Sequence, residues 1–183
     1  MNKIIKSYLL FISGIFLIQF YVTAWIIPFT IQNYGIFRNY VSELALTDTS
    51  MLFLISMLIS GSGSILIGIF SPRRIQIAQI AWGISVIIAG IFPTDQSGSI
   101  DSISATVHGV AAISGFLFVL ASSYFARNKI QYGNVLFGVL LISTIIFFIS
   151  TDTIVGLTQK IMISMQILFQ LFLAYSLRNQ NDN

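Results

Sequence analysis

Residues 50–70 read SMLFLISMLISGSGSILIGIF, a stretch without a charged side chain. A helix rises 1.5 Å per residue, so about 20 apolar residues cross the roughly 30 Å of hydrocarbon in a bilayer. Backbone amides in lipid must find their partners within the segment, which makes a helix the expected conformation. This stretch therefore predicts a transmembrane helix.

Five other stretches have a similar length and composition, and the predicted spans cover residues 7–29, 50–70, 75–92, 103–125, 131–149 and 156–177. The chain of 183 residues is 56% hydrophobic and 8% charged, whereas soluble domains carry about 25% charged residues. We expect a single integral membrane domain over residues 1–183, an all-α bundle of six transmembrane helices. Residues 22–24 loosely resemble a signal-peptide cleavage site, but the apolar run continues past them and favours a retained first span.

The cations are distributed unevenly about these spans. Seven lie on the side of the two termini, namely Lys3, Lys6, Arg73, Arg74, Arg127, Lys129 and Arg178, and two lie opposite, Arg38 and Lys160. The positive-inside rule then places both termini in the cytoplasm of a multi-pass plasma-membrane protein. The net charge of +3 comes from cations that flank spans, so the expected partners are membrane lipids and not nucleic acid.

Small and amide side chains recur at helical spacing within the spans. Small residues allow close helix contact in lipid. They line two faces, Ser60, Ser64 and Gly68 on one, with Gly61 and Gly63 beside them, and Ala105, Gly109 and Ala112 on the other, joined by Ala111 and Gly115. We expect these faces to pack against neighbouring helices; contact with a second copy or a protein partner is another use of them. Gln159, Gln166 and Gln170 share one face of the last span, which should turn inward for interhelical hydrogen bonding or to line a polar path.

Most groups capable of acid, base or nucleophilic chemistry lie on the side with few cations. Five of the six acids are there, Glu43, Asp48, Asp95, Asp101 and Asp152, with Asp182 on the other side. His108 is the single histidine of the chain and lies about 8 Å inside the outer end of its span. An ionisable group at that depth is a candidate functional residue, although a neutral imidazole bonded to a neighbouring helix explains it equally well.

These residues suggest specific roles. We expect Asp95 to orient His108 as a general base, with either Ser42 or water as the nucleophile. Glu43 is a candidate second acid or metal ligand, and Arg38 and Lys160 are candidate contacts for an anionic headgroup. The chain has no cysteine and one histidine, too few for a closed zinc site or a haem between two histidines. No cofactor is predicted, and metal binding through oxygen ligands stays open.

Four motifs resemble one family of membrane proteins. They are Tyr34 with RNYVSEL at 38–44, GIFPTD at 90–95, HGVAA at 108–112 and GLTQK at 156–160. Together they resemble the six-span bacterial and archaeal membrane proteins of domain-of-unknown-function family 998, which implies a six-helix membrane fold and no established activity. Such proteins often have Glu-Arg where this chain has Gln159-Lys160. More remotely, the Ser, Asp and His set looks like that of lipid hydrolases related to alkaline ceramidases, which have several metal-binding histidines.

Two functions follow as hypotheses. The first is an intramembrane enzyme that acts on a lipid or lipid-linked substrate from the outer leaflet, with the site described above. The second is a non-enzymatic small transporter or accessory subunit, in which the glutamine face of 156–177 lines a path or holds the last span in place.

Overall fold

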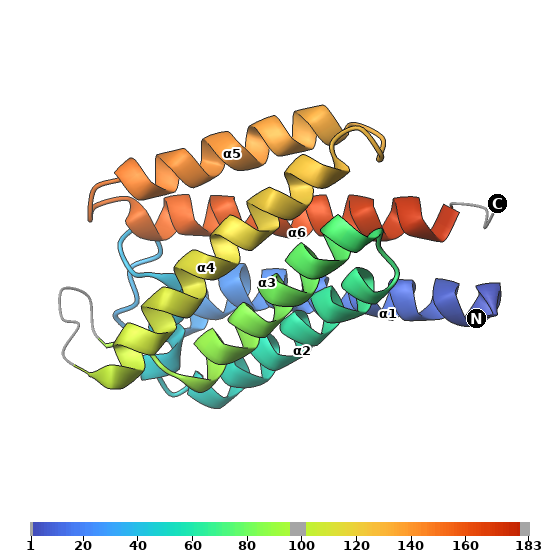
Figure 1. Ribbon diagram of the computed structural model, residues 1–183. Coiled ribbons are helices and arrows are strands. Elements are labelled where there is room, and N and C mark those ends of the chain that lie inside the picture. Colours follow the sequence, from blue (N-terminus) through green and yellow to red (C-terminus); the bar gives the residue numbers. More distant parts are fainter. Residues whose placement is uncertain (1, 96–101, 180–183) are drawn as a thin grey trace.

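The computed structural model describes residues 2–95 and 102–179 (Figure 1). Six α-helices follow the six predicted spans in order, α1 (Lys3–Ile26), α2 (Ser50–Ile69), α3 (Arg73–Ile91), α4 (Ile103–Ala126), α5 (Gly133–Ile149) and α6 (Val155–Asn179). Two short 3-10 helices, η1 (Ile27–Thr30) and η2 (Val41–Leu46), lie in the connection between α1 and α2. The predicted all-α membrane bundle is confirmed.

Five of the helices are long and apolar enough to cross a membrane, and α5, with 17 residues, is shorter. At 1.5 Å per residue α5 extends about 26 Å. It begins later than predicted because Tyr132 takes a left-handed conformation, with a φ of 60°. Similarly, α1 ends at Ile26, and Pro28 lies inside the following 3-10 helix. The chain is a multi-pass membrane protein.

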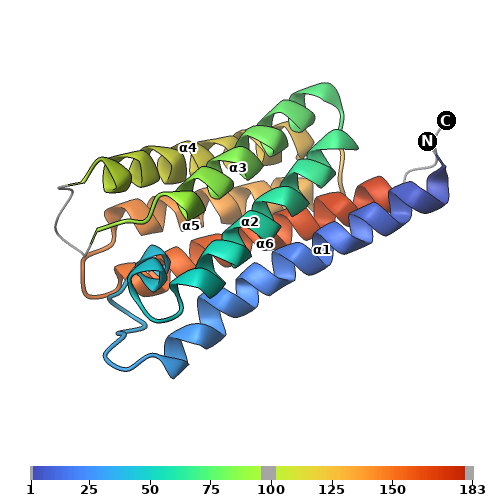
Figure 2. The same cartoon turned by 90° about the horizontal axis from the view of Figure 1, so that it is seen from below.

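The helices pack in chain order, and α6 closes the bundle against α1 and α5. α1 begins and α6 ends at the same end of the molecule, beside the α2–α3 and α4–α5 connections (Figures 1 and 2). The seven cations predicted to share one side therefore share this end. The opposite end carries the long connection from Ile31 to Thr49. Asp101 and Asp182 lie outside the described residues.

The small residues of α2 pack closely against α3. A Cβ placed on Gly61 would lie 2.6 Å from the Gly83 carbonyl oxygen of α3, and one on Gly83 would lie 2.5 Å from the Gly61 oxygen. Ser64 Oγ donates a hydrogen bond of 2.7 Å to Gln79 Oε1 across the same interface. The packing face predicted on α2 is confirmed. The one predicted on α4 is partly wrong, because Gly109 faces open space while Gly115 packs against Ser85.

α6 is the most deeply packed helix, and its glutamines turn inward as predicted. The exposed fractions of Gln159, Gln166 and Gln170 are 8%, 3% and 0%. Among the described residues, no partner reaches Gln166 Nε2 or either amide atom of Gln170. Unpaired amides are costly inside a membrane bundle, so these two positions require an explanation beyond packing.

Candidate functional site

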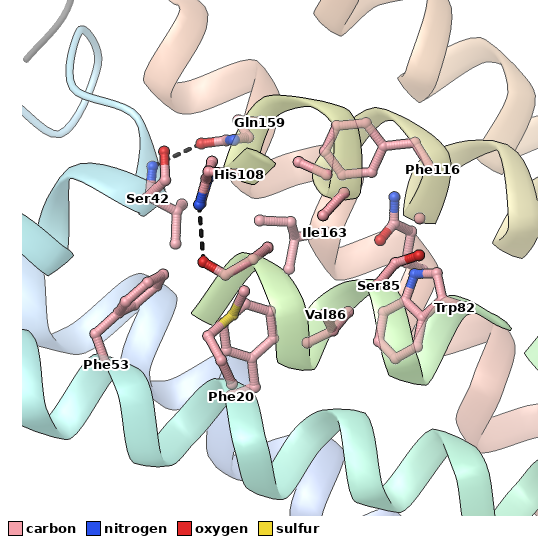
Figure 3. Close-up of a pocket in the computed structure, with 17 residues that line it drawn as sticks. Phe20, Ser42, Phe53, Trp82, Ser85, Val86, His108, Phe116, Gln159 and Ile163 are labelled. Atoms are coloured by element: carbon pink, nitrogen blue, oxygen red, sulfur yellow. Dashed lines mark hydrogen bonds between the residues drawn. The ribbon is translucent and has the colours of Figure 1, made fainter. Parts of the chain in front are cut away.

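A cavity of about 60 Å³ lies under η2, in the half of the bundle opposite the two termini. A water molecule needs about 10–15 Å³ by this measure, so the cavity has room for a few waters or a slender ligand. Figure 3 shows side chains from several helices pointing into it. The lining includes Phe20, Ser42, Phe53, Met57, Trp82, Ser85, His108, Gly115, Phe116, Gln159, Ile163 and Gln166. Among the residues that the structure describes, none that lines the cavity is an acid, a lysine or an arginine.

His108 lies on α4 at the η2 end of this cavity and is 7% exposed. Its Nδ1 is 2.8 Å from the Ala89 carbonyl oxygen and 2.9 Å from that of Phe92, at the end of α3. Carbonyl oxygens accept hydrogen bonds, so Nδ1 carries a proton, and in the neutral form of the imidazole Nε2 is then the unprotonated nitrogen. Among the described residues, Nε2 has no hydrogen-bond partner, which makes it available as a base.

The predicted role of Asp95 does not match this geometry. Asp95 accepts hydrogen bonds from the Ser102 amide at 2.9 Å and the Ser102 hydroxyl at 3.0 Å, just before α4 begins. The Ser102 hydroxyl in turn accepts from the Ala105 amide and caps α4. Asp95 therefore supports the start of α4, and the backbone of α3 orients His108. The last carbonyls of a helix lack partners within it, which is why they are suited to this task.

Ser42 enters the cavity lining from η2, whose position is fixed by α6. The Gln159 Oε1 atom accepts a hydrogen bond of 2.6 Å from the Val41 amide, next to Ser42 (Figure 3). Leu157 N donates to the Phe37 carbonyl oxygen at 3.2 Å. Ser42 is half-buried, and its hydroxyl has no hydrogen-bond partner among the described residues. The structure thus brings Ser42 and His108 to the same cavity.

Lys160 anchors the loop that carries Ser42. Its side chain is 0% exposed, and Nζ donates to the carbonyl oxygens of Ile36 at 3.0 Å and of Asn39 and Gly156 at 3.4 Å each. Nζ also lies 5.3 Å from the centroid of the Tyr34 ring. The predicted contact of Lys160 with a lipid headgroup does not fit this arrangement, because the ammonium is enclosed by protein.

Glu43 belongs to the same anchor and does not line the cavity. It is 7% exposed, accepts a hydrogen bond from Asn39 Nδ2, and its charge acts on Lys160. Burial first, and the Glu43 charge second, raise the pKa of the Tyr34 hydroxyl far above its usual value. That hydroxyl therefore stays protonated and donates to the Tyr40 carbonyl oxygen at 2.6 Å.

The remaining candidates are apart from the cavity. Arg38 is exposed on the turn from Gly35 to Asn39, where a headgroup could meet it. Asp48 and Asp152 are exposed as well. Within residues 2–95 and 102–179, no three His, Asp or Glu side chains are grouped as metal ligands would be.

Several residues of the site were not predicted from the sequence. Gly156 is one, because a Cβ there would collide with the Asn39 carbonyl oxygen and lie 2.9 Å from that of Ile36. Gly156 and Lys160 are four residues apart and therefore lie on one helix face. This spacing is the feature of the sequence that could have linked Gly156 to the site. Trp82 and Ser85 line the cavity from α3, and their positions gave no signal distinct from ordinary packing.

Comparison with known proteins agrees with the motifs. A family model described as Protein of unknown function (DUF998) matches residues 15–176. The chain belongs to this family. The match covers all the motifs that suggested it, including those that contribute Ser42, Asp95, His108 and Lys160. No curated protein and no solved structure matches the DUF998 chain.

Proposed function

We propose that this DUF998 protein is an intramembrane enzyme that acts on a lipid or lipid-linked substrate reaching the cavity from the outer leaflet. The observation that carries the proposal is the fixed tautomer of His108, whose unprotonated Nε2 shares a cavity with Ser42. A serine hydroxyl is a weak nucleophile until a base takes its proton.

The reaction class that fits this pair is acyl transfer. His108 Nε2 accepts the Ser42 proton as Ser42 Oγ bonds to a carbonyl carbon of the substrate, and the imidazolium then protonates the leaving group. Water, activated by the same nitrogen, releases the acyl group and restores the hydroxyl. The Nδ1 proton, held by the Ala89 and Phe92 carbonyls, stays on the ring throughout. Arg38, exposed at the outer end, is proposed to contact an anionic headgroup.

Replacing His108 by asparagine tests the base role while keeping the structural one. The Asn amide can still donate toward the α3 carbonyls, but it cannot accept a proton at the position of Nε2. We expect His108→Asn and Ser42→Ala to lower turnover by at least about 100-fold with the melting temperature nearly unchanged. The measurement is mass spectrometry of lipid extracts incubated with the purified protein in vesicles.

Ser62→Ala is the matched control, because Ser62 is exposed and donates within α2 to Leu58. Wild-type activity in His108→Asn would exclude the base role. Unchanged lipids together with a solute flux that is lost in Gln170→Leu would favour the second candidate, a small transporter. The unpartnered amide of Gln170 is the observation in favour of that candidate.

We also propose that both termini face the cytoplasm and that the membrane is the plasma membrane. Seven of the nine lysines and arginines lie at the end of the termini, and such an excess is typical of the cytoplasmic side. The chain contains no cysteine, so a single introduced thiol reports its side. We expect Thr153→Cys, at the α5–α6 connection, to react with an impermeant maleimide in intact cells. Asn128→Cys, at the α4–α5 connection, should react after permeabilisation. The reverse pattern would refute this orientation.

A further inference from the structure

The cavity extends along the bundle from Ser42 and His108 toward Gln166, and its walls are largely apolar. Its lining on α6 runs from Gln159 to Gln166, and its lining on α4 runs from His108 through Gly115 to Phe116; Gln159 and Gln166 form one pair and His108 and Gly115 another. Each pair is seven residues apart, which is about 10 Å along a helix. The side walls are apolar, from Phe20, Phe53, Met57, Val86, Phe116 and Ile163. A length of about 10 Å and apolar walls, with no charged lining residue among those described, fit an uncharged hydrocarbon chain better than a headgroup.

The end of the cavity away from η2 carries two polar side chains among apolar ones. Gln166 lines it, is 3% exposed, and its Nε2 has no partner among the described residues. Ser85 of α3 lines the cavity too and is 7% exposed. Two polar side chains at the end of an apolar space in a membrane bundle are unfavourable unless something pairs with them. The amide of Gln166 is therefore suited to bind an oxygen atom of the occupant.

We infer that the cavity binds a single hydrocarbon chain of the substrate that carries a neutral oxygen, a hydroxyl or a carbonyl, about 10 Å from the reacting group. Gln166, with Ser85 lining the same end, pairs with that oxygen and selects such chains over chains that carry no oxygen. This inference rests on the proposed function in one respect, that the reacting end of the occupant lies at His108. Binding of the chain itself does not require catalysis.

The protein contains a built-in reporter for the chain. It has two tryptophans, and one of them, Trp82, lines the cavity and is 2% exposed. The other, Trp25, is half-buried on α1 and donates to Ser164. In a Trp25→Phe background, fluorescence comes from Trp82 alone. A monoacylglycerol brominated in the middle of its chain should quench this emission, because bromine quenches tryptophan on contact.

Competition then tests the oxygen site. We expect an unlabelled monoacylglycerol with a mid-chain hydroxyl to relieve the quenching at about tenfold lower concentration than the same lipid without the hydroxyl. A tenfold difference is the effect of one hydrogen bond. Gln166→Met, which keeps the shape and removes the amide, should abolish this preference. Ser62→Ala should preserve it, and Ala112→Phe, which fills the cavity, should abolish the quenching.

Equal competition by the two chains would overturn the selection for an oxygen, since water would then be the partner of Gln166. No quenching in the Trp25→Phe protein, despite a normal melting temperature, would overturn the chain site altogether. His108→Asn separates this inference from the proposed function. If His108→Asn loses turnover but no protein shows quenching, the enzyme proposal stands and the chain site fails. If quenching is observed but no protein shows turnover, the chain site stands and the enzyme proposal fails.

Discussion

Gly61→Ala is expected to destabilise the protein by about 1–3 kcal/mol, the usual cost of inserting atoms into a packed interior. The added Cβ would lie 2.6 Å from the Gly83 carbonyl oxygen, which is backbone and cannot turn aside. α2 and α3 would have to separate along the interface that holds the Ser64–Gln79 hydrogen bond. Gly61→Leu should have a larger effect. The measurement is the midpoint of thermal unfolding in detergent.

Gly138→Ala provides the matched control for this substitution. Gly138 lies inside α5, and a Cβ there meets no atom within 4 Å. Alanine is the better helix former by about 1 kcal/mol, so this variant should be as stable as the wild type or more so. Equal loss of stability in the two variants would mean that the close α2–α3 crossing does not contribute to folding in the way described.

The contrast between Gly61 and Gly109 shows how much of the fold the sequence could predict. Apolar runs fixed the existence and order of the six helices, because length and hydropathy decide which segments cross a bilayer. Which glycine meets a neighbour depends on the rotation of each helix, and a spacing of four residues constrains that rotation weakly in a helix that is apolar on all sides. Gly61 and Gly109 both belonged to small-residue stripes, yet one is at a crossing and the other faces open space.

The candidate site was predictable in location and less so in detail. The depth of His108 and the inward face of the α6 glutamines followed from helix periodicity. Asp95 was paired with His108 because carboxylates commonly orient imidazoles, but the free carbonyls at the end of α3 perform that task. Lys160 was expected to face outward as a cation near a span end. The loop carbonyls that surround it come from residues more than 100 positions away, which local patterns do not reveal.

Lys160→Met is expected to release the loop that holds Ser42. Methionine keeps much of the volume but leaves the carbonyl oxygens of Ile36 and Asn39 without their donor and Glu43 without its cation. Leaving a buried acceptor without its donor costs about 1–3 kcal/mol, and here two carbonyl oxygens lose theirs. A cost of about 3 kcal/mol raises the population of the open loop by roughly 100-fold. The Gln159–Val41 hydrogen bond would then be too weak by itself to keep η2 in place.

Trypsin can measure this release at Arg38, which is exposed but lies in a turn closed by the hydrogen bond from Asn39 N to the Gly35 oxygen. A protease needs an extended backbone, so cleavage after Arg38 reports the open loop.

We expect faster cleavage in Lys160→Met and in Gly156→Ala, whose Cβ would collide with the Asn39 carbonyl. Asp152→Asn, an exposed change at the same end, should leave the rate unchanged. Adding Glu43→Gln to Lys160→Met should recover part of the protection, because it removes a buried negative charge that Lys160 no longer offsets. Cleavage at the wild-type rate in both anchor variants would show that the loop is held by other contacts.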